Sequence, residues 1–246
     1  MASLKLAGAT VRYGERVVLR EVSFALAAGE RVALIGPNGS GKTTLLRALA
    51  GLMPLSAGTV QPPRGTPRRA MAKLLAYVPQ EEYWEFPFPV VEVVACGRYA
   101  HSDSLFGESA EDREAVDAAL VAVDMESMRD RPINAISGGE RRRAILARAL
   151  AQRAPAMLLD EPTTALDLGH REAVLGAVRE YRGAVLFATH DLDAAAAIAD
   201  RIVVLADGEI VMDGAPRAVL TEALLADVFN VKARVIEEDW RLHVLL

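Results

Sequence analysis

The nine residues from Gly36 to Thr44 have the composition and spacing of a loop that binds phosphate. The loop consists of Gly36, Pro37, Asn38, Gly39, Ser40, Gly41, Lys42, Thr43 and Thr44. Its glycines allow backbone N–H groups to curl around an anion, because no Cβ blocks a close approach. The Lys42 ammonium can reach the β- and γ-phosphates of a nucleoside triphosphate, and the Thr43 hydroxyl can ligate Mg²⁺. The pattern predicts a nucleoside triphosphate site with its Mg²⁺.

The elements on either side decide between a phosphate loop and an ordinary glycine-rich loop that happens to contain a lysine. Val32–Ile35 is an apolar run typical of a buried strand, and Leu45–Ala50 has the composition of a helix that ends at Gly51. Strand, glycine-rich turn and helix, in this order, form the setting in which such loops bind phosphate. The helix N-terminus adds N–H donors and a partial positive charge at the same point. This setting favours the phosphate loop.

Carboxylates and a histidine follow two other predicted strands. Asp160 and Glu161 come after the apolar run Met157–Leu159, and His190 follows Val185–Thr189. Ligands of open α/β sheets collect at the carboxyl ends of strands. Asp160 is predicted to lie in the second coordination sphere of Mg²⁺, and Glu161 to polarise the attacking water as a general base. His190 can hydrogen-bond a γ-phosphate. The alternatives are a carboxylate that merely ends a strand and a structural histidine.

Two more residues are candidates for the same site. Gln80 follows a predicted strand, and its amide can orient water or Mg²⁺; the alternative is an ordinary turn residue. Tyr13 precedes a predicted turn, and its flat ring can stack on adenine. The alternative for Tyr13 is a half-buried strand residue.

The stretch Ile136–Glu140 predicts a second anion-binding helix N-terminus. Ser137 is followed three residues later by Glu140, which is the pattern of a capping box. A cap does not need the two consecutive glycines, Gly138 and Gly139, but an anion that touches the helix N-terminus does. The phosphate loop already holds one triphosphate, so this second helix is expected to complete a site on another copy of the chain.

Length and composition exclude some classes of protein. The chain has 246 residues, 28 basic and 33 acidic, and a net charge of −5. A chain of this length can bury one domain, or one domain with a subdomain, and the acidic balance disfavours non-specific nucleic-acid binding. The single cysteine, Cys96, cannot form an internal disulfide. Without a signal peptide or an apolar run long enough to span a membrane, we expect a soluble cytoplasmic protein whose membrane role comes from a partner.

The order of the predicted elements is that of an α/β protein with a helical insertion. Apolar and polar residues alternate over residues 4–34, which predicts several short strands with turns at Gly14 and Gly29. Further strands are predicted at residues 58–60, 74–78, 156–159, 185–189, 202–205 and 209–212, the last two joined as a hairpin by Asp207-Gly208. Helices are predicted over residues 90–151 and after the caps Asp167, Asp191 and Thr221, with Ser109 and Asp112 forming a capping box. Residues 231–246 are expected to form a short tail.

Two segments could serve a partner. Residues 81–89, which we name the aromatic loop, contain Tyr83, Trp84, Phe86 and Phe88 together with Pro87 and Pro89, and the prolines argue against regular structure. The rings either pack locally or anchor a partner protein. Residues 54–69 are expected to form an exposed loop around the strand at 58–60. Its arginines, Arg64, Arg68 and Arg69, are a solvated basic loop or, alternatively, a phosphate patch for nucleic acid.

Taken together, these motifs resemble those of the ATP-binding cassette (ABC) family over almost the whole chain. In order, they are Tyr13 for the aromatic that stacks on adenine, Gly36–Thr43 for Walker A, Gln80 for the Q-loop, Ile136–Glu140 for the signature, Ala156–Glu161 for Walker B, Thr163–Asp167 for the D-loop and His190 for the switch histidine. Ile136 stands where the family more often has leucine, which leaves the phosphate-contacting Ser-Gly-Gly intact. The resemblance implies a RecA-like P-loop NTPase core with an N-terminal antiparallel β subdomain and an inserted helical subdomain.

The resemblance also implies an ATPase that closes head-to-tail around two ATP molecules with Mg²⁺. Ser137, Gly138 and Gly139 then contact the γ-phosphate held by the second copy, and Asp167 belongs to the same nucleotide site. Since Glu161 is present, a hydrolysis-competent site is expected. The implied divisions are 1–88 and 152–220 for the RecA-like and β core, 89–151 for the helical subdomain, and 221–246 for the C-terminal helix and tail.

A finer resemblance concerns the branch of the family. Phe88–Tyr99 and Leu220–Val235 resemble the ATPases of importers for iron-siderophores, haem and cobalamin. This implies integral membrane permease subunits as partners, a substrate-binding protein as an indirect partner, no nucleic acid, and a peripheral place on the cytoplasmic face of the membrane. The alternative is a soluble ABC ATPase without a transporter, such as a scaffold ATPase for iron–sulfur cluster assembly.

Overall fold

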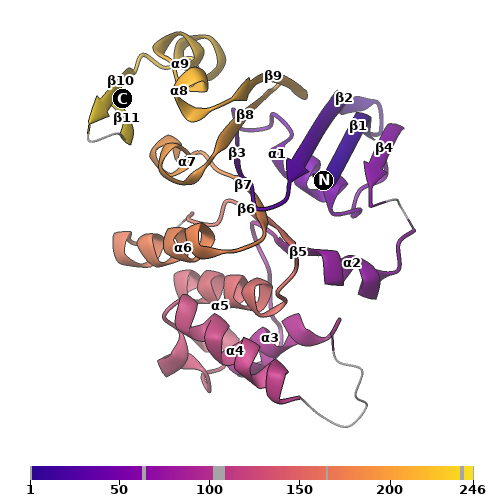
Figure 1. Cartoon of the computed structure of the whole chain (residues 1–246), viewed down its shortest axis with the longest axis vertical. Helices are drawn as coiled ribbons and strands as arrows, with labels where there is room; N and C mark the ends of the chain where they lie inside the picture. Colours follow the sequence, from indigo (N-terminus) through magenta and orange to yellow (C-terminus); the bar gives the residue numbers. More distant parts are fainter. Residues whose placement is uncertain (1, 63–64, 102–108, 165, 239–240, 246) are drawn as a thin grey trace. The chain divides into compact units, whose positions relative to one another are not determined.

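The computed structural model describes residues 2–62, 65–101, 109–164, 166–238 and 241–245, and its elements are labelled in Figure 1. The chain divides into two compact units. The first consists of Met1–Thr66, Leu158–Glu161 and Ala184–Leu246, and the second of Pro67–Met157 and Pro162–Gly183. No helix of the described residues is long and apolar enough to cross a membrane.

An antiparallel sheet opens the first unit. Its strands are β1 (Ala2–Tyr13), β2 (Arg16–Ala27) and β4 (Ala57–Gln61), in the order β2-β1-β4. The prediction of several short strands is wrong in length, because β1 and β2 are 12 residues each. The pairing of β1 with β2 shifts register at four places, including the step from Leu6 to Ala9. Such bulges interrupt the two-residue alternation on which the prediction depended.

A mostly parallel sheet forms the centre of the first unit. Its strands lie in the order β6 (Ala156–Asp160), β7 (Ala184–Ala188), β3 (Arg31–Ile35), β8 (Arg201–Ala206) and β9 (Glu209–Gly214). β3 runs parallel to both β7 and β8. Every residue of β6 and β7 is buried, which explains their continuous apolar composition. The predicted β8–β9 hairpin is confirmed, with both Asp207 and Gly208 at positive φ.

Helices and a C-terminal hairpin complete the first unit. The helices are α1 (Lys42–Leu49), α7 (Leu192–Ile198), α8 (Pro216–Val219) and α9 (Glu222–Phe229). Where a short tail was expected, β10 (Arg234–Glu238) pairs antiparallel with β11 (Arg241–Leu245). The Val244 amide donates to Asp193 of α7 at 3.0 Å, so this hairpin depends on a contact 51 residues away in the sequence.

The second unit is mainly helical. It contains α2 (Arg68–Leu74), β5 (Leu75–Val78), α3 (Val90–Ala95), η1 (Cys96–Arg98), α4 (Ala110–Ala122), η2 (Glu126–Met128), η3 (Ile133–Ala135), α5 (Gly138–Ala151) and α6 (Leu168–Glu180). α5 packs against α3 and α4. The buried Arg98 guanidinium bonds Asp112 at 2.8 Å and the Ala151 carbonyl at 2.9 Å, which ties η1 to the neighbouring helices.

The predicted basic loop has partly a structural role. Arg64 lies outside the described residues, and Arg68 begins α2 as an exposed side chain. Arg69 Nε donates to the Ala100 carbonyl at 3.1 Å, so this side chain ties α2 to the residues after η1.

Candidate nucleotide-binding site

The phosphate loop connects β3 to α1 and packs against its neighbours so closely that two positions require glycine. A Cβ on Gly36 would lie 2.0 Å from the Leu205 carbonyl oxygen, and one on Gly41 would lie 2.9 Å from Leu19 Cδ2. Both glycines also have positive φ, of 155° and 108°. The loop is therefore pressed against β8 and β2, with its backbone free of side chains at the points of contact.

Several donors converge on this loop. The first N–H groups of α1, from Lys42 onward, have no partner within the helix, as at every helix N-terminus. Ser40 is 5% exposed, and its Oγ has no hydrogen-bond partner among the described residues. Backbone donors, a buried hydroxyl and the positive end of a helix make a cradle that fits a phosphate group.

The side chain of Lys42 folds back onto the phosphate loop. Its Nζ donates to the Gly36 carbonyl at 2.7 Å and to the Pro37 carbonyl at 3.2 Å. Burial lowers the pKa of this ammonium from 10.5, and the negative charges of Glu161 and Asp160 oppose that effect. The ammonium is thus the cation of a site that also holds two carboxylates, and it has a third N–H for a phosphate oxygen.

At the end of β6, the backbone turns sharply at Glu161. This residue has φ 53°, a left-handed conformation that non-glycine residues adopt rarely. Its amide donates to the Ala188 carbonyl at the end of β7, 3.0 Å away. Glu161 Oε2 lies 2.7 Å from His190 Nδ1, with side-chain exposures of 10% and 65%. Since a carboxylate only accepts, Nδ1 carries the proton, and the imidazole positions the carboxylate.

The donor set of the first unit fits Mg²⁺ held jointly with phosphates. Asp160, 1% exposed, supplies a carboxylate at the end of β6, and Thr43 supplies a hydroxyl in the first turn of α1. In the described ranges no group of three or more His, Cys, Asp or Glu side chains is arranged as a metal site. Mg²⁺ is commonly bound by one or two protein ligands together with substrate phosphates and water.

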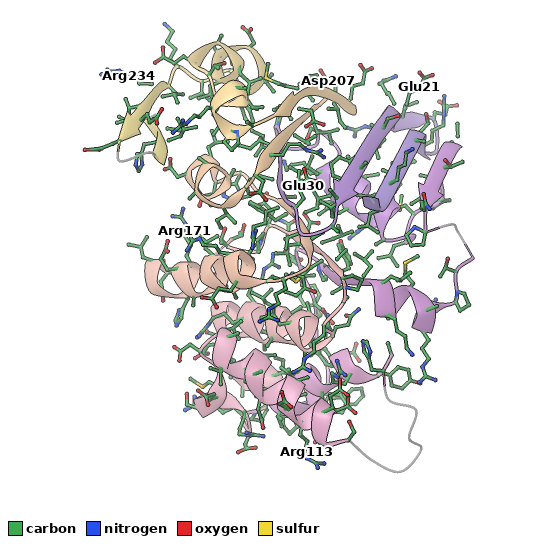
Figure 2. The ribbon with its side chains drawn as sticks, in the orientation of Figure 1. Glu21, Glu30, Arg113, Arg171, Asp207 and Arg234 are labelled. Carbon is green, nitrogen blue, oxygen red and sulfur yellow. The ribbon has the colours of Figure 1, made fainter. Side chains whose placement is uncertain are left out.

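A pocket beside the phosphate loop was not anticipated from the sequence. It has a volume of about 480 Å³ and is lined by Glu15, Arg16, Val17, Val18, Arg20, Gly39, Asp207 and Gly208. Figure 2 shows Asp207 at the turn between β8 and β9. Tyr13 ends the strand before this pocket; it is 49% exposed, and its hydroxyl contacts Met53 Sδ at 3.5 Å. Apart from Gly39 of the phosphate loop, no motif marks this pocket, because its residues come from three separate segments of the chain: residues 15–20, Gly39 and the turn at residues 207–208.

The second unit holds the remaining predicted site residues. Ser137 caps α5 as expected: its Oγ accepts from the Glu140 amide at 3.2 Å, and its own amide donates to Glu140 Oε2 at 2.7 Å. The bonds from Ser137 lower the pKa of the Glu140 carboxyl. Ser137 and Gly138 are exposed, and a Cβ on Gly138 would meet nothing within 4 Å. The hydroxyl can still donate outward while it accepts the capping bond.

The D-loop residue Asp167 has a capping role in the structure. It is exposed and accepts from the His170 amide at 2.9 Å at the start of α6; this bond lowers the pKa of the carboxyl. Ala165, in the middle of the predicted D-loop, lies outside the described residues. The structure therefore shows a helix cap at this position, as the sequence predicted.

The aromatic loop packs some of its rings locally and exposes others. Gln80, just before it, is exposed, and Arg142 of α5 donates to the carbonyls of Pro79 and Gln80. Trp84 packs edge-on against Phe88, with ring centroids 6.1 Å apart. Tyr83 and Phe86 instead are 81% and 65% exposed. Phe86 also packs edge-on against Phe88, at 6.1 Å between ring centroids, so three of the four rings are in local contact while Tyr83 and Phe86 remain largely exposed.

The family model and the similar proteins found by sequence comparison all describe ATP-binding proteins of transporters. A family model described as ABC transporter matches residues 19–164. The hemin import ATP-binding protein HmuV of Nocardia farcinica is 47% identical, over 90% of this chain and 79% of that protein. The cobalamin import ATP-binding protein BtuD of Halobacterium salinarum is 39% identical, over 95% of this chain and 60% of that protein.

Solved structures agree with the described fold. A transporter described as metal-chelate type, in an inward-facing conformation, superposes with a TM-score of 0.82 and 26% identity over 100% of this chain and 96% of that one. The dimeric structure of a bacterial ABC transporter cassette superposes with a TM-score of 0.78 and 27% identity over 87% of this chain and 99% of that one. The predicted α/β cassette fold is confirmed.

Proposed function

The chain belongs to the ABC transporter family and is an ATP-binding ATPase subunit of that family; from this premise we propose that it powers an importer of haem, cobalamin or a related iron chelate. Its identity to a hemin import and a cobalamin import protein supports this cargo class. The division into a core (1–88 and 152–220), a helical subdomain (89–151) and a C-terminal part (221–246) is part of the same proposal.

We propose that this site binds ATP mainly through its phosphates. The loop from Gly36 to Thr44 cradles the triphosphate, and Tyr13 stacks on adenine beside the 480 Å³ pocket. Thr43, Gln80 and Asp160 are the residues that would hold Mg²⁺, which neutralises charge on the phosphates when bound. The buried Lys42 ammonium places a positive charge beside the phosphates.

Glu161 is the proposed general base of hydrolysis. Its carboxylate takes a proton from water as the water oxygen bonds to the γ-phosphorus, and the bond from that phosphorus to the bridging oxygen of ADP breaks. The 2.7 Å contact with His190 Nδ1 holds the carboxylate in place and leaves Nε2 to face the γ-phosphate. Gln80 orients the water, and Lys42 stabilises charge that develops on the transferred group.

One observation carries the proposal of a two-copy site: the chain has a second helix N-terminus built for an anion. Ser137, Gly138 and Gly139 begin a 14-residue helix with an exposed hydroxyl and no side chain to obstruct an approaching group. We propose that two copies meet head-to-tail, so that these residues bind the γ-phosphate of the other copy's ATP, and that Asp167 lines the same interface.

The aromatic loop is the proposed contact with membrane permease subunits, on the cytoplasmic face of the membrane. Exposed Tyr83 and Phe86 offer apolar anchors of the kind found in protein interfaces. A pocket of about 270 Å³ lies between this loop and α5, with Gln80, Tyr83 and Ile145 among its lining residues. A partner seated there would touch the Q-loop and the signature helix together.

Two measurements test the proposal. Glu161→Gln should bind Mg-ATP, hydrolyse it poorly and accumulate as a dimer in sedimentation; a variant that stays monomeric at saturating Mg-ATP contradicts the head-to-tail site. Purification in detergent should recover a multi-span membrane partner. Recovery of a soluble assembly instead would favour a cassette ATPase of iron–sulfur cluster assembly.

A further inference from the structure

Helix α5 carries the signature residues at its N-terminus. Further along, its arginines hydrogen-bond the aromatic loop and the residues just before it. We propose that Arg142, Arg148 and Glu82, which we name the arginine strap, make the aromatic loop and the signature helix move as one body. Arg148 and Glu82 are then positioning residues: a partner that moves the loop moves Ser137 with it. This inference rests on the proposed two-copy site.

The pair of Arg148 and Glu82 is the main bond of the strap. Arg148 Nη1 and Nη2 each donate to a different Glu82 oxygen, both at 2.6 Å. The side chains are 20% and 25% exposed. The Arg148 guanidinium also lies 5.9 Å from the centre of the Trp84 ring, which covers it on one side. A bidentate pair partly shielded from water is stronger and geometrically more restricted than a surface ion pair.

Arg142 adds a second attachment nearer the signature. Its Nη1 donates to the carbonyls of Pro79 and Gln80, so α5 holds the backbone of the Q-loop itself. Arg142 therefore holds the two residues just before the aromatic loop, and Arg148 holds Glu82 within it, so the loop cannot shift along α5 without losing charge-assisted bonds.

α5 is stiff enough to transmit such a movement. Seven of its 14 residues are buried. Arg143, 2% exposed, donates to the Val123 and Asp124 carbonyls at 2.9 and 2.8 Å, and Arg98 bonds the Ala151 carbonyl at the other end. A packed helix held at several points moves as a unit, because protein interiors are too dense to deform continuously.

Coupling between two sites is reciprocal, so the strap can be tested without the membrane partner. If the loop acts on Ser137, then ATP that engages Ser137 across a dimer must act on the loop. The fluorescence of Trp84 reports on the environment of the aromatic loop. Replacing Trp240, which lies outside the described residues, by Phe leaves Trp84 as the only tryptophan, since the chain has two.

The experiment uses the full chain with Glu161→Gln and Trp240→Phe. Mg-ATP should produce a dimer in sedimentation and change the acrylamide quenching of Trp84. Adding Glu82→Gln should leave the dimer and reduce the Trp84 response several-fold, because the ionic pair is lost with little change of shape. Arg148→Lys keeps the positive charge but cannot form the bidentate pair with Glu82, so it should give an intermediate Trp84 response.

Glu85→Gln is the matched control. It removes the same charge from the same loop, at an exposed residue that forms no ion pair in the part of the chain the structure describes, and should leave the Trp84 response intact. Equal responses of Glu82→Gln and Glu85→Gln overturn the strap, as does a dimer without any change at Trp84 or a Glu82→Gln chain that no longer dimerises. A background chain that fails to dimerise instead overturns the two-copy site on which the inference rests.

Discussion

At the scale of single residues, the site depends on backbone positions that few side chains tolerate. Gly36 must lack a Cβ because the Leu205 carbonyl would lie 2.0 Å from it. Glu161 accepts a left-handed backbone, at φ 53°, in a place where the chain turns from β6. Strained conformations of this kind persist where the surrounding structure holds them, and they are frequent at functional sites.

Gly36→Ala should therefore destabilise the chain by about 3 kcal/mol and abolish nucleotide binding, since a backbone carbonyl cannot move aside as a flexible side chain can. Urea unfolding and nucleotide titration measure the two effects. Gly176→Ala in α6 is the control: nothing lies within 4 Å of its Cβ, and a helical alanine should add about 0.5–1 kcal/mol. Equal stabilities of the two variants would contradict the close packing of the loop.

His190→Ala should lower the rate of ATP hydrolysis about 100-fold and leave the ATP affinity within about threefold. The imidazole holds Glu161 at 2.7 Å but contributes no bond to the phosphate loop. Steady-state kinetics and equilibrium binding separate the two quantities. His243→Ala, in the C-terminal hairpin, should change neither. A loss of affinity equal to the loss of rate would show that His190 is a binding residue instead.

At the scale of elements, two capping boxes of the same type serve two helices. Ser109 caps α4 through the Asp112 amide at 3.0 Å, and Ser137 caps α5 through the Glu140 amide at 3.2 Å. Each reciprocal pair satisfies donors that the helix leaves open. Only the second is followed by two glycines, so the pair allows an ordinary cap to be compared with the cap that is proposed to bind an anion as well.

Ser109→Ala and Ser137→Ala should each cost about 1 kcal/mol of folding stability, as the loss of a cap does. Only Ser137→Ala should also reduce ATP hydrolysis strongly, because it removes the hydroxyl that we propose donates to the γ-phosphate of the other copy. Thermal unfolding and ATPase assays on both variants measure this. Equal activities of the two variants would limit Ser137 to a capping role.

The helical unit should lose stability in acid through Asp112. The bond from Arg98, and a second one from Ser109, hold the pKa of the Asp112 carboxyl below its usual 3.8. A carboxyl whose pKa is lower in the folded chain contributes stability above pH 3.8, and this stability falls as the pH drops through the folded pKa. Protonation neutralises the nearer of the two carboxylates paired with Arg98, whose side chain is 6% exposed; the other, Glu111, lies 3.6 Å away and is 70% exposed.

Asp112→Asn should consequently destabilise the chain by about 3 kcal/mol at pH 7, since it removes the buried carboxylate at 2.8 Å from the Arg98 guanidinium and leaves only the exposed Glu111 as its ion-pair partner. The difference from the unsubstituted chain should shrink as the pH falls below 3.8. Urea unfolding at a series of pH values tests both statements. Asp117→Asn removes a carboxylate from an exposed pair with Arg129 and should have little effect at any pH.

At the scale of the whole molecule, each chain has one phosphate loop and one further helix N-terminus, that of α5, which we propose binds an anion. If each cradle is completed by the helix of a second copy, the specific rate of ATP hydrolysis must rise with protein concentration until dimers saturate. Measuring the rate over a dilution series, with sedimentation alongside, tests this. A constant specific rate in a preparation that stays single-copy would contradict the proposed dimer.

The sequence also indicated the branch of the family. The resemblance of Phe88–Tyr99 and Leu220–Val235 pointed to importers of haem, cobalamin and iron-siderophores, and the identity to hemin and cobalamin import proteins agrees with it. Nothing in the ATPase sites distinguishes one cargo from another, because these sites contact only nucleotide in the proposed mechanism.

What the sequence determined by itself was local chemistry. The caps at Ser109, Ser137, Asp167, Asp191 and Thr221 were all predicted and confirmed. So were the apolar strands and the glycine-rich turn between β3 and α1. These features depend on residues a few positions apart, so that composition and spacing are sufficient to find them.

Only the tertiary structure decided which distant residues meet. The contact of Glu161 with His190 joins residues 29 positions apart, and the arginine strap joins Arg148 to Glu82 over 66. The bulges of β1, the C-terminal hairpin on α7 and the packing of Gly36 against β8 belong to the same class. Each depends on strand register or on how helices pack, and these are set by many weak contacts summed over the core rather than by any short stretch of sequence.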